Sequence, residues 1–391
     1  MSQELAYVIV TPYSLYKSRT GGILSRLISR TGLDLAAMRM FAPGPELVKQ
    51  YAETMVSAQD PQDRKIQELL EQYVLRNLSP DPKTGQRRRI LMMVFRGDEA
   101  IRKIRAVVGN LSPDRRTGET IRDTYGDLIV DDDGQVRYFE PAVHAAPNAH
   151  EAEIKLKLWA RYSDTDGGVL ENVITYPPGQ IGERTLVLIK PDNFKFPTGQ
   201  PGNVIDFFSR TGLYIVGAKV LHMSLAQAME FYGPVLEVLR TKLSDAIAER
   251  AKNALEKELG FKIPPAQQQA LGDILGPLHG DHQFENLMRF MTGFTPSERR
   301  TEAERRLPGT QKCIALIYEG VNAIRKIRDV LGPTDPSKAP PGSIRREFGS
   351  NITVNAAHAS DSVENAQREM AIVNVGENNF RQIIEAAYGK V

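Results

Sequence analysis

The chain repeats itself in order. The hexapeptide AIRKIR occupies Ala100 to Arg105 and recurs from Ala323 to Arg328. A second echo, SRTGL, begins at Ser29 and again at Ser209. Repeated stretches that keep their order are the signature of a duplicated structural unit. The sequence therefore predicts two copies of one fold in tandem, the second lengthened by inserted residues.

The length of 391 residues is enough for two ordinary domains, each with its own core. We place the first domain at 1–162 and the second at 183–391. The segment 163–182, rich in Gly, Pro and Asp, is expected to be a linker. The second domain should carry insertions near 234–282 and 293–310.

Composition excludes several classes of protein. A net charge of +2 gives no strong attraction to DNA or to a membrane. No apolar run approaches the roughly 20 residues of a membrane span, and the N-terminus lacks the features of a secretory signal, so we expect a cytoplasmic protein. Cys313, the single cysteine, excludes an intramolecular disulfide and a cysteine-rich zinc site, and its apolar surroundings indicate a buried strand.

Each copy shows the same order of elements. An apolar strand is followed by a helix that ends in SRTGL, where Gly32 or Gly212 suits a C-cap. A second strand, helical segments, a third strand and the AIRKIR helix come next. This order predicts an α/β fold, an α+β sandwich whose sheet is covered by helices. In the second copy, leucines and isoleucines from Leu236 to Leu255 fall at helical spacing and predict an added amphipathic helix.

The clearest chemical signal surrounds His358, in NITVNAAHASDSVENAQREM. A β-prone stretch leads to the histidine, and Asp361 with Glu364 has the spacing of a capping box. A helix should therefore begin just after the histidine, and a helix N-terminus is suited to an anion. A single histidine near a helix start is more often structural, so the motif needs supporting residues.

Supporting residues are present in the same copy, in the runs IKPDNF, AIRKIRDVLGPTDP and PPGSIRREFGSN. With Asn355 to Ser362, read as Asn-Ala-Ala-His-Ala-Ser-Asp-Ser, the sequence resembles nucleoside diphosphate kinase over most of 183–375. The resemblance implies tandem ferredoxin-like domains. It also implies ping-pong transfer of the γ-phosphoryl group from a nucleoside triphosphate to a nucleoside diphosphate through a phosphorylated histidine.

The resemblance assigns roles residue by residue. His358 matches the nucleophile, Glu369 the acid that orients the imidazole, and Ser360 the residue that supports that acid. The matched nucleotide contacts are Lys190 and Tyr232 near the transferred phosphate, Arg328, Thr334 and Arg345 as a phosphate clamp, Asn355 at ribose and phosphate, and Phe284 with Ile352 around the base. The cofactor implied is Mg²⁺ carried by the nucleotide phosphates, with no metal site formed by protein residues.

These roles suit the residue types. A carboxylate bonded to one imidazole nitrogen aims the lone pair of the other. Phosphoryl transfer needs charge neutralisation more than covalent help, which arginine forks, a lysine and Mg²⁺ supply.

The first copy departs from the motif. His144 matches His358, and Arg105, Arg122 and Tyr51 persist at the places of Arg328, Arg345 and Tyr232. The remaining matched positions hold Thr11 for Lys190, Leu111 for Thr334, Pro141 for Asn355, Ala146 for Ser360, Pro147 for Asp361 and Lys155 for Glu369. The stretch before His144 is also longer, and DDDGQ indicates an added turn.

We therefore expect the first copy to be a degenerate domain without turnover, kept for structure, assembly or weak nucleotide binding. Slow phosphorylation of His144 is the alternative. For the whole chain, the rival hypothesis is a nucleotide-binding or scaffold protein with little turnover. Nucleic-acid binding on the sheet would need exposed aromatics on central strands, and we see no such set.

The expected partners are ATP and other nucleoside tri- and diphosphates, with neither a membrane nor a specific nucleic acid. Because members of the resembled family assemble, the two copies should pair as a pseudo-dimer within the chain. Three chains could then form a trimer that imitates a hexamer.

Overall fold

A computed structural model describes residues 3–111 and 118–391. The chain falls into two compact units, one made of Met1–Val220 with Ile314–Val391, and one made of Leu221–Cys313. Both copies of the repeat lie in the first unit, and the second unit is helical. No helix in the described ranges is long and apolar enough to span a membrane.

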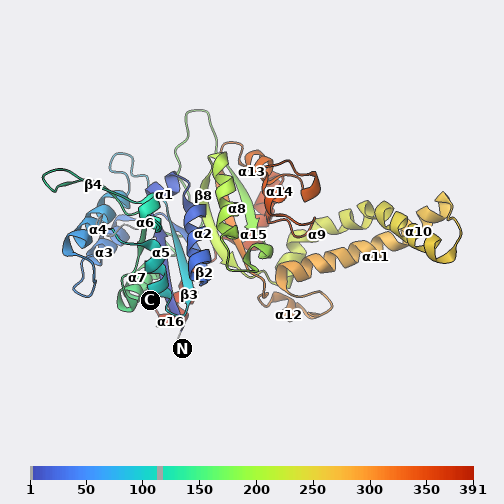
Figure 1. Cartoon of the computed structure of the whole chain (residues 1–391), viewed down its shortest axis with the longest axis horizontal. Coiled ribbons are helices and arrows are strands. Elements are labelled where there is room, and N and C mark those ends of the chain that lie inside the picture. Colours follow the sequence, from blue (N-terminus) through green and yellow to red (C-terminus); the bar gives the residue numbers. More distant parts are fainter. Residues whose placement is uncertain (1–2, 112–117) are drawn as a thin grey trace. The chain divides into compact units, whose positions relative to one another are not determined.

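The first copy contains a four-stranded antiparallel sheet in the order β2-β3-β1-β6 (Figure 1). Its strands are β1 (Glu4–Val10), β2 (Asp34–Phe41), β3 (Ile90–Gly97) and β6 (Val143–Ala145). Its helices are α1 (Pro12–Tyr16), α2 (Thr20–Thr31), α3 (Pro45–Glu53), α4 (Arg64–Asn77), α5 (Ala100–Val108), α6 (Ile121–Tyr125) and α7 (Ala149–Arg161). An additional hairpin, β4 (Asp127–Val130) and β5 (Val136–Glu140), occupies the place of the expected added turn.

The second copy repeats this topology in the order β10-β7-β9-β8. Its strands are β7 (Glu183–Ile189), β8 (Tyr214–Leu221), β9 (Cys313–Gly320) and β10 (Ala357–Ala359). Its helices are α8 (Gln200–Phe208), α13 (Ala323–Leu331), α14 (Ile344–Phe348), α15 (Val363–Val373) and α16 (Asn379–Tyr388), with short 3-10 turns at Pro191–Phe194, Ser209–Thr211 and Pro336–Lys338. The tandem ferredoxin-like architecture is confirmed, because both sheets place the first and third strands at the centre.

The repeated peptides form the same structure in both copies. The AIRKIR helices α5 and α13 each follow a residue in the left-handed region, Glu99 (φ 52°) and Asn322 (φ 55°). Within the SRTGL segments, Gly32 (φ 63°) and Gly212 (φ 66°) are the C-caps of the helical turns, as expected. A positive φ of this kind costs glycine little, which explains why glycine caps both turns.

The two copies pack on each other through α2 and α8, at a close crossing of glycines. A Cβ atom added at Gly21 would lie 2.5 Å from the backbone nitrogen of Asp206 and from the carbonyl oxygen of Gly202. The helix backbones are therefore in direct contact, and no side chain fits between them.

The segment 163–182 is not a detached tether. The N–H of Gly168 donates to the carbonyl of Met40 on β2 (2.9 Å), and the N–H of Leu170 donates to the carbonyl of Val216 on β8 (2.8 Å). β2 and β8 are each an edge strand of their sheet, so this segment satisfies backbone groups at one edge of each sheet.

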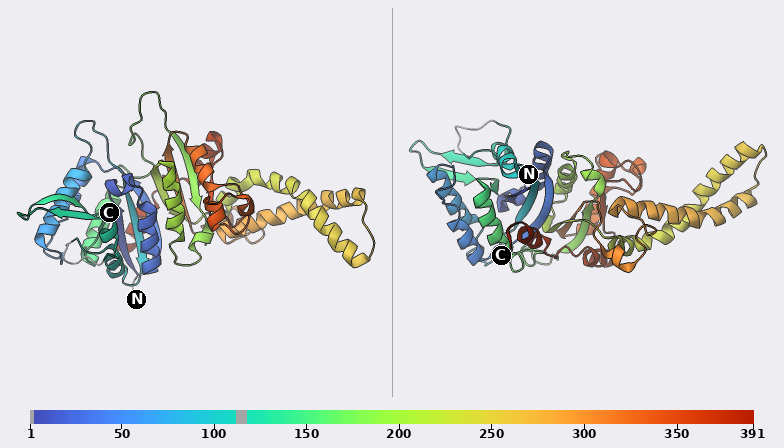
Figure 2. Two further views of the ribbon diagram at one scale, coloured as in Figure 1. Left: turned by 45° about the horizontal axis from the view of Figure 1, so that its top comes forward. Right: turned by 90° about the horizontal axis from the view of Figure 1, so that it is seen from below.

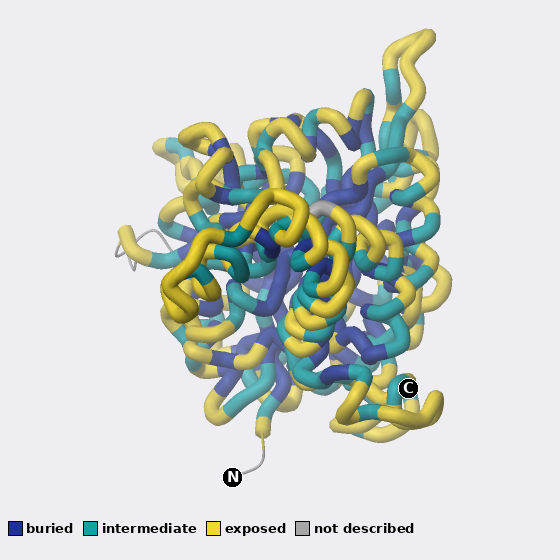
Figure 3. The backbone as a smooth tube through the Cα atoms, turned by 90° about the vertical axis from the view of Figure 1, so that its right-hand side faces the viewer, coloured by how far each residue is buried: buried dark blue, intermediate teal, exposed yellow. Residues whose placement is uncertain are grey.

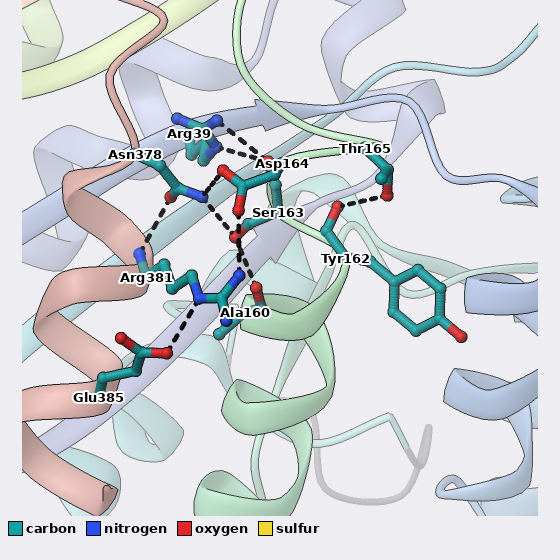
Figure 4. A network of polar contacts seen from close by, with 9 residues as sticks. All are labelled: Arg39, Ala160, Tyr162, Ser163, Asp164, Thr165, Asn378, Arg381 and Glu385. Carbon is teal, nitrogen blue, oxygen red and sulfur yellow. Dashed lines mark hydrogen bonds and ion pairs between the residues drawn. The ribbon is translucent and has the colours of Figure 1, made fainter. Parts of the chain in front are cut away.

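The C-terminal helix α16 belongs to the second copy in sequence but packs on α7 and β2 of the first (Figure 4). Phe380 is buried and meets Phe41 edge-on, with ring centroids 5.7 Å apart. The side-chain amide of Asn378 donates to Ser163 Oγ (2.7 Å) and Asp164 Oδ1 (2.6 Å), and Arg381 pairs with Asp164 (3.0 Å). Apolar and charged contacts thus fasten the end of the chain to the first copy.

The helical unit contains α9 (Leu225–Lys242), α10 (Ser244–Leu259), α11 (Pro265–Thr292) and α12 (Glu302–Arg306) (Figure 2). The expectation of one added helix through Leu255 is wrong in one respect, because the chain breaks at Leu243 between α9 and α10. The break lets α10 and α9 pack on α11, where Gly272 and Gly280 allow close approach to Ala248 and Arg240.

Burial follows the sheets. The central strands are buried along almost their whole length. Figure 3 shows the buried stretches of the chain running through the interior. Cys313 is fully buried at the start of β9, as its apolar run predicted. Trp159, the only tryptophan, is fully buried in the first copy against Phe41 and Tyr51.

Candidate active site

His358 is the middle residue of the short strand β10, which pairs with the end of β7 opposite Leu188. Its side chain is 22% exposed, so the imidazole is held by the protein and still reachable from solvent. Ala356, just before the strand, adopts a left-handed conformation (φ 69°) that turns the chain into β10. The fold therefore presents the histidine from a short, fixed strand.

Glu369 and Ser360 orient the imidazole. His358 Nε2 lies 2.9 Å from Glu369 Oε2, and the Ser360 hydroxyl donates to the same oxygen at 2.7 Å. Both supporting side chains are buried. A carboxylate that accepts from Nε2 keeps the proton on that nitrogen and places the imidazole lone pair on Nδ1.

Lys190 and Asn355 form the second part of the site. Lys190 directly follows β7 and donates from Nζ to Asn355 Oδ1 and to the carbonyl of Thr353, both at 2.8 Å. The Asn355 amide nitrogen donates to the carbonyls of Thr334 (3.1 Å) and Ile352 (2.9 Å). Asn355 thereby joins the lysine to the two loops that carry Thr334 and Ile352. Thr334 and Ile352 are themselves exposed.

Arg345 reaches the strand of the histidine. From α14 its guanidinium donates to the carbonyls of Gly332 (3.0 Å) and Ala357 (3.2 Å). It thus supports the backbone next to His358. Arg328, at the end of α13, is exposed and lines a surface pocket of about 420 Å³ with Asp361 and Ser362, which follow His358 closely in the chain.

The helix after the histidine begins one residue later than the capping-box spacing predicts. Ser362, and not Asp361, is the N-cap of α15, and its hydroxyl accepts from the N–H of Asn365 (3.1 Å). Asp361 instead accepts from the side-chain amide of Asn365 (2.7 Å). Both residue types cap helices well, so spacing to a glutamate could not separate them.

Within residues 3–111 and 118–391, no cluster of three or more His, Cys, Asp or Glu side chains is placed to hold a metal ion. Mg²⁺ typically keeps several waters and binds through nucleotide phosphates with few protein carboxylates. A Mg²⁺ ion carried by the nucleotide stays a prediction.

The model of the family described as "Nucleoside diphosphate kinase" matches residues 4–164, 183–238 and 237–377. These segments cover both copies and together account for most of the chain. The chain belongs to the nucleoside diphosphate kinase family.

Individual nucleoside diphosphate kinases match about half of the chain and nearly all of their own length. The protein named nucleoside diphosphate kinase from Wolinella succinogenes is 32% identical over 189 residues, which is 48% of this chain and 93% of the relative. That from Campylobacter hominis is 30% identical over 194 residues, 50% of this chain and 96% of the relative.

Solved structures of nucleoside diphosphate kinases are also similar. The enzyme from Pyrobaculum aerophilum is 26% identical, with 49% of this chain and 95% of that chain covered and a TM-score of 0.34. The Aquifex aeolicus enzyme is 26% identical over the same shares, with a TM-score of 0.30.

Two nucleotide contacts expected from the nucleoside diphosphate kinase motif lie in the helical unit. Tyr232 is buried on α9, with its hydroxyl 3.7 Å from the sulfur of Met291. Phe284 is buried on α11. Both are packed as core residues of that unit, and their roles in nucleotide binding stay predictions.

The structure adds two residues that motif reasoning did not single out. Asp192 Oδ2 accepts from the N–H of Ala356 (3.0 Å), and burial raises the pKa of Asp192. The Asn193 amide donates to the carbonyls of Lys190 (2.9 Å) and Ala356 (2.7 Å). Both hold the bend before His358. Their signal was the run PDNF directly after the strand, which the motif used only as a landmark.

The first copy keeps the backbone frame of this site. His144 pairs with Ile9 on β1 as His358 pairs with Leu188 on β7, which places Thr11 at the position of Lys190. Arg122 donates to the carbonyls of Gly109 (2.9 Å) and Val143 (3.2 Å), as Arg345 does in the second copy. This shared pair of bonds shows that the arginine has a structural role in both copies.

The polar side chains near His144 differ from those near His358. Thr11 donates to Glu140 Oε1 (2.9 Å), the Tyr73 hydroxyl donates to Glu140 Oε2 (2.7 Å), and the N–H of Ala142 also donates to Oε1 (2.9 Å). A buried carboxylate network thus stands where the second copy has its lysine and asparagine. Burial raises the pKa of Glu140.

His144 is enclosed. It is 3% exposed, and the rings of Tyr51 and Tyr73 lie 6.0 and 5.7 Å from it. Burial, with the charges of Arg122 and Lys155, lowers the pKa of His144 to about 3. Its Nε2 has no hydrogen-bond partner among the residues that the structure describes. Lys155, at the place of the orienting acid, instead pairs with Glu151 (3.0 Å).

Proposed function

We propose that the second copy is a nucleoside diphosphate kinase that works through phosphorylated His358. The bonded series from Ser360 through Glu369 to His358 Nε2 is the observation that carries the proposal. It orients the imidazole with a lone pair on Nδ1, and the His358 side chain is partly exposed. Membership of the family supports the substrate class.

In the first half-reaction, His358 Nδ1 attacks the γ-phosphorus of a nucleoside triphosphate. The nitrogen–phosphorus bond forms, the bond from phosphorus to the β–γ bridging oxygen breaks, and the nucleoside diphosphate leaves. In the second, a terminal oxygen of another diphosphate attacks the phosphohistidine and the nitrogen–phosphorus bond breaks. The Nε2 proton stays hydrogen-bonded to Glu369 throughout.

Charge neutralisation would come from Lys190, Arg345 and Arg328, with Asn355 linking the lysine to the loop of Thr334. Lys190 and Asn355 are buried and already bonded, which favours a preorganised site. Mg²⁺ bound to the nucleotide would neutralise the β and γ phosphates.

The test compares wild type with His358→Ala and His144→Ala, using γ-labelled ATP and a second nucleoside diphosphate. We expect label on the protein and transfer to the diphosphate in wild type and His144→Ala, and neither in His358→Ala. Full activity of His358→Ala would overturn the proposal. Label in a His358→Gln variant would show that His144 accepts phosphate. Nucleotide binding without labelling in wild type would favour a binding or scaffold protein.

A further inference from the structure

A small cavity lies where the two copies meet. Its volume is about 30 Å³, which is enough for one or two waters or a single monatomic ion and is far below the roughly 300 Å³ at which pockets for organic ligands begin. The first copy contributes Thr20, Gly21 and Arg89 among others, and the second contributes residues of α8, β8 and β9, including Tyr318. The cavity is therefore part of the interface between the copies.

Two hydroxyl groups in the lining have no hydrogen-bond partner among the residues that the structure describes. Tyr318, on β9, is 3% exposed, and its ring packs against that of Phe208 with centroids 5.6 Å apart. Thr20, the first residue of α2, is 4% exposed. Buried hydroxyls are nearly always bonded to protein or to an ordered occupant such as water. Two unpartnered hydroxyls in the lining of one cavity therefore indicate an occupant.

The charge beside the cavity favours an anion over water. Arg89 donates from Nη1 to the carbonyl of Ile215 (2.6 Å) and lies over the ring of Tyr214, 5.0 Å from its centroid, but it forms no ion pair within the described residues. Burial lowers the pKa of Arg89 to about 10. None of the described residues that line the cavity is an aspartate or a glutamate. Because buried cations are usually paired, an anion in the cavity would supply the missing partner.

The N-terminus of α2 offers further donors. Its N-cap residue, Arg19, makes no side-chain capping bond, and the first two residues of the helix, Thr20 and Gly21, line the cavity. Helix N-termini carry a partial positive charge and N–H groups that bind anions. Burial raises the pKa of Tyr318, so its hydroxyl keeps its proton and can donate. The guanidinium, the helix N-terminus and the hydroxyls thus border one small space.

The matching positions of the repeat do not reproduce these groups. By the offset of the repeated hexapeptide, Tyr318 corresponds to Phe95, which has no hydroxyl. By the offset of SRTGL, Gly21 corresponds to Pro201, which has no N–H. We therefore expect one such site per chain.

We propose that this cavity binds a monatomic anion, chloride in solution, between Arg89 and α2 of the first copy and Tyr318 of the second. Because the anion accepts hydrogen bonds from both copies, its binding stabilises their packing on each other. None of the described lining residues belongs to the site around His358, so this anion site does not depend on the kinase activity proposed above.

Bromide is the probe for the wild-type chain, because its anomalous scattering distinguishes it from water. Crystals soaked in sodium bromide should show one bromide per chain in this cavity, within hydrogen-bond distance of Arg89 or Tyr318. A cavity that holds only water in such crystals would overturn the proposal without any substitution.

Thermal unfolding tests the same site in solution. At constant ionic strength, replacing gluconate with chloride should raise the Tm of wild type in a saturable way, because a ligand that binds only the folded chain stabilises it. In Tyr318→Phe, the chloride concentration needed for half of that rise should increase at least tenfold, because one hydrogen bond to a charged ligand is lost. Tyr16→Phe, at an exposed tyrosine outside the lining, is the matched control and should respond like wild type. Equal responses of wild type and Tyr318→Phe would show that chloride does not bind there.

Arg89→Met should abolish the chloride-dependent rise in Tm, because the cation of the site is gone. A saturable response that persists in this variant would contradict the site. The fluorescence of Trp159 verifies that the variants fold, since this tryptophan is buried in the first copy.

Discussion

Arg39 and Lys219 occupy the same position in β2 and β8, and both donate to the turn between α15 and α16. Arg39 Nη1 bonds to the carbonyls of Gly376 (3.3 Å) and Glu377 (3.1 Å). Lys219 Nζ bonds to those of Val373 (3.2 Å) and Asn374 (3.0 Å) and pairs with Glu377 Oε2 (2.6 Å). Equivalent cations of the two copies thus hold one turn, from which α16 crosses to the first copy.

Replacing Arg39 with methionine should loosen that crossing. The guanidinium also donates twice to the carbonyl of Ser163, so its loss takes the donor from this buried carbonyl and from those of Gly376 and Glu377 (Figure 4). We expect a loss of about 3 kcal/mol in the free energy of unfolding. Hydrogen exchange in Asn379–Tyr388 should accelerate. Arg64→Met, at an exposed pair with Glu68, serves as the control and should change neither quantity.

The glycine crossing of α2 and α8 should not tolerate a methyl group. In Gly21→Ala the new Cβ meets backbone atoms of Asp206 and Gly202, which cannot move independently of their helix. We expect a destabilisation of about 1–3 kcal/mol in urea unfolding. Gly233→Ala on α9 meets nothing within 4 Å and should be neutral or slightly stabilising. Equal effects of the two substitutions would show that the helices do not cross at Gly21.

Ser360 should act on catalysis only through Glu369. Glu369→Ala should lower kcat/KM by about 10²-fold. Ser360→Ala should lower it by about tenfold, because one hydrogen bond to a charged group is lost. In the double variant, Ser360→Ala should add little to the loss caused by Glu369→Ala. Steady-state kinetics of wild type, the two single variants and the double variant gives the coupling between Ser360 and Glu369. If the two losses in kcat/KM multiply in the double variant, Ser360 does not act through Glu369.

The buried His144 should make the first copy sensitive to acid. Its pKa of about 3 in the folded state lies below the ordinary value of 6.5, so below about pH 6 the unfolded chain binds a proton that the folded chain does not. Stability should therefore fall as pH falls from 6.5 towards 3. Relative to His144→Gln, wild type should lose about 1.4 kcal/mol per pH unit in that window. Urea unfolding followed by Trp159 fluorescence measures the difference, and parallel curves would exclude a buried neutral histidine.

Local sequence patterns predicted much of the fold and part of the candidate site. The repeated SRTGL and AIRKIR peptides predicted equivalent helices in both copies, and the glycine at each C-cap was readable because few other residues adopt a positive φ easily. The motif that pairs His358 with Glu369 predicted the hydrogen bond between them, since the residues lie on adjoining elements. The Ser362 cap was missed because Asp361 and Ser362 cap equally well.

Other features had no local signal. The sequence shows DDDGQ as extra residues, but only the folded chain makes them the turn of a hairpin whose strand β5 packs on α4. Asp192 and Asn193 act on the backbone of Ala356, which is far away in the chain. No periodicity relates such distant residues.

By itself, the sequence determined that the chain is a duplication, that one copy carries the histidine with its acid, and that the other has lost this acid to Lys155. These are statements about residue types at fixed spacing. Only the tertiary structure decided that His144 is buried, that Glu140 stands in for the lost lysine and asparagine, and that α16 fastens the two copies together. Burial and long-range hydrogen bonds depend on which distant segments meet, and this is settled only when the chain packs.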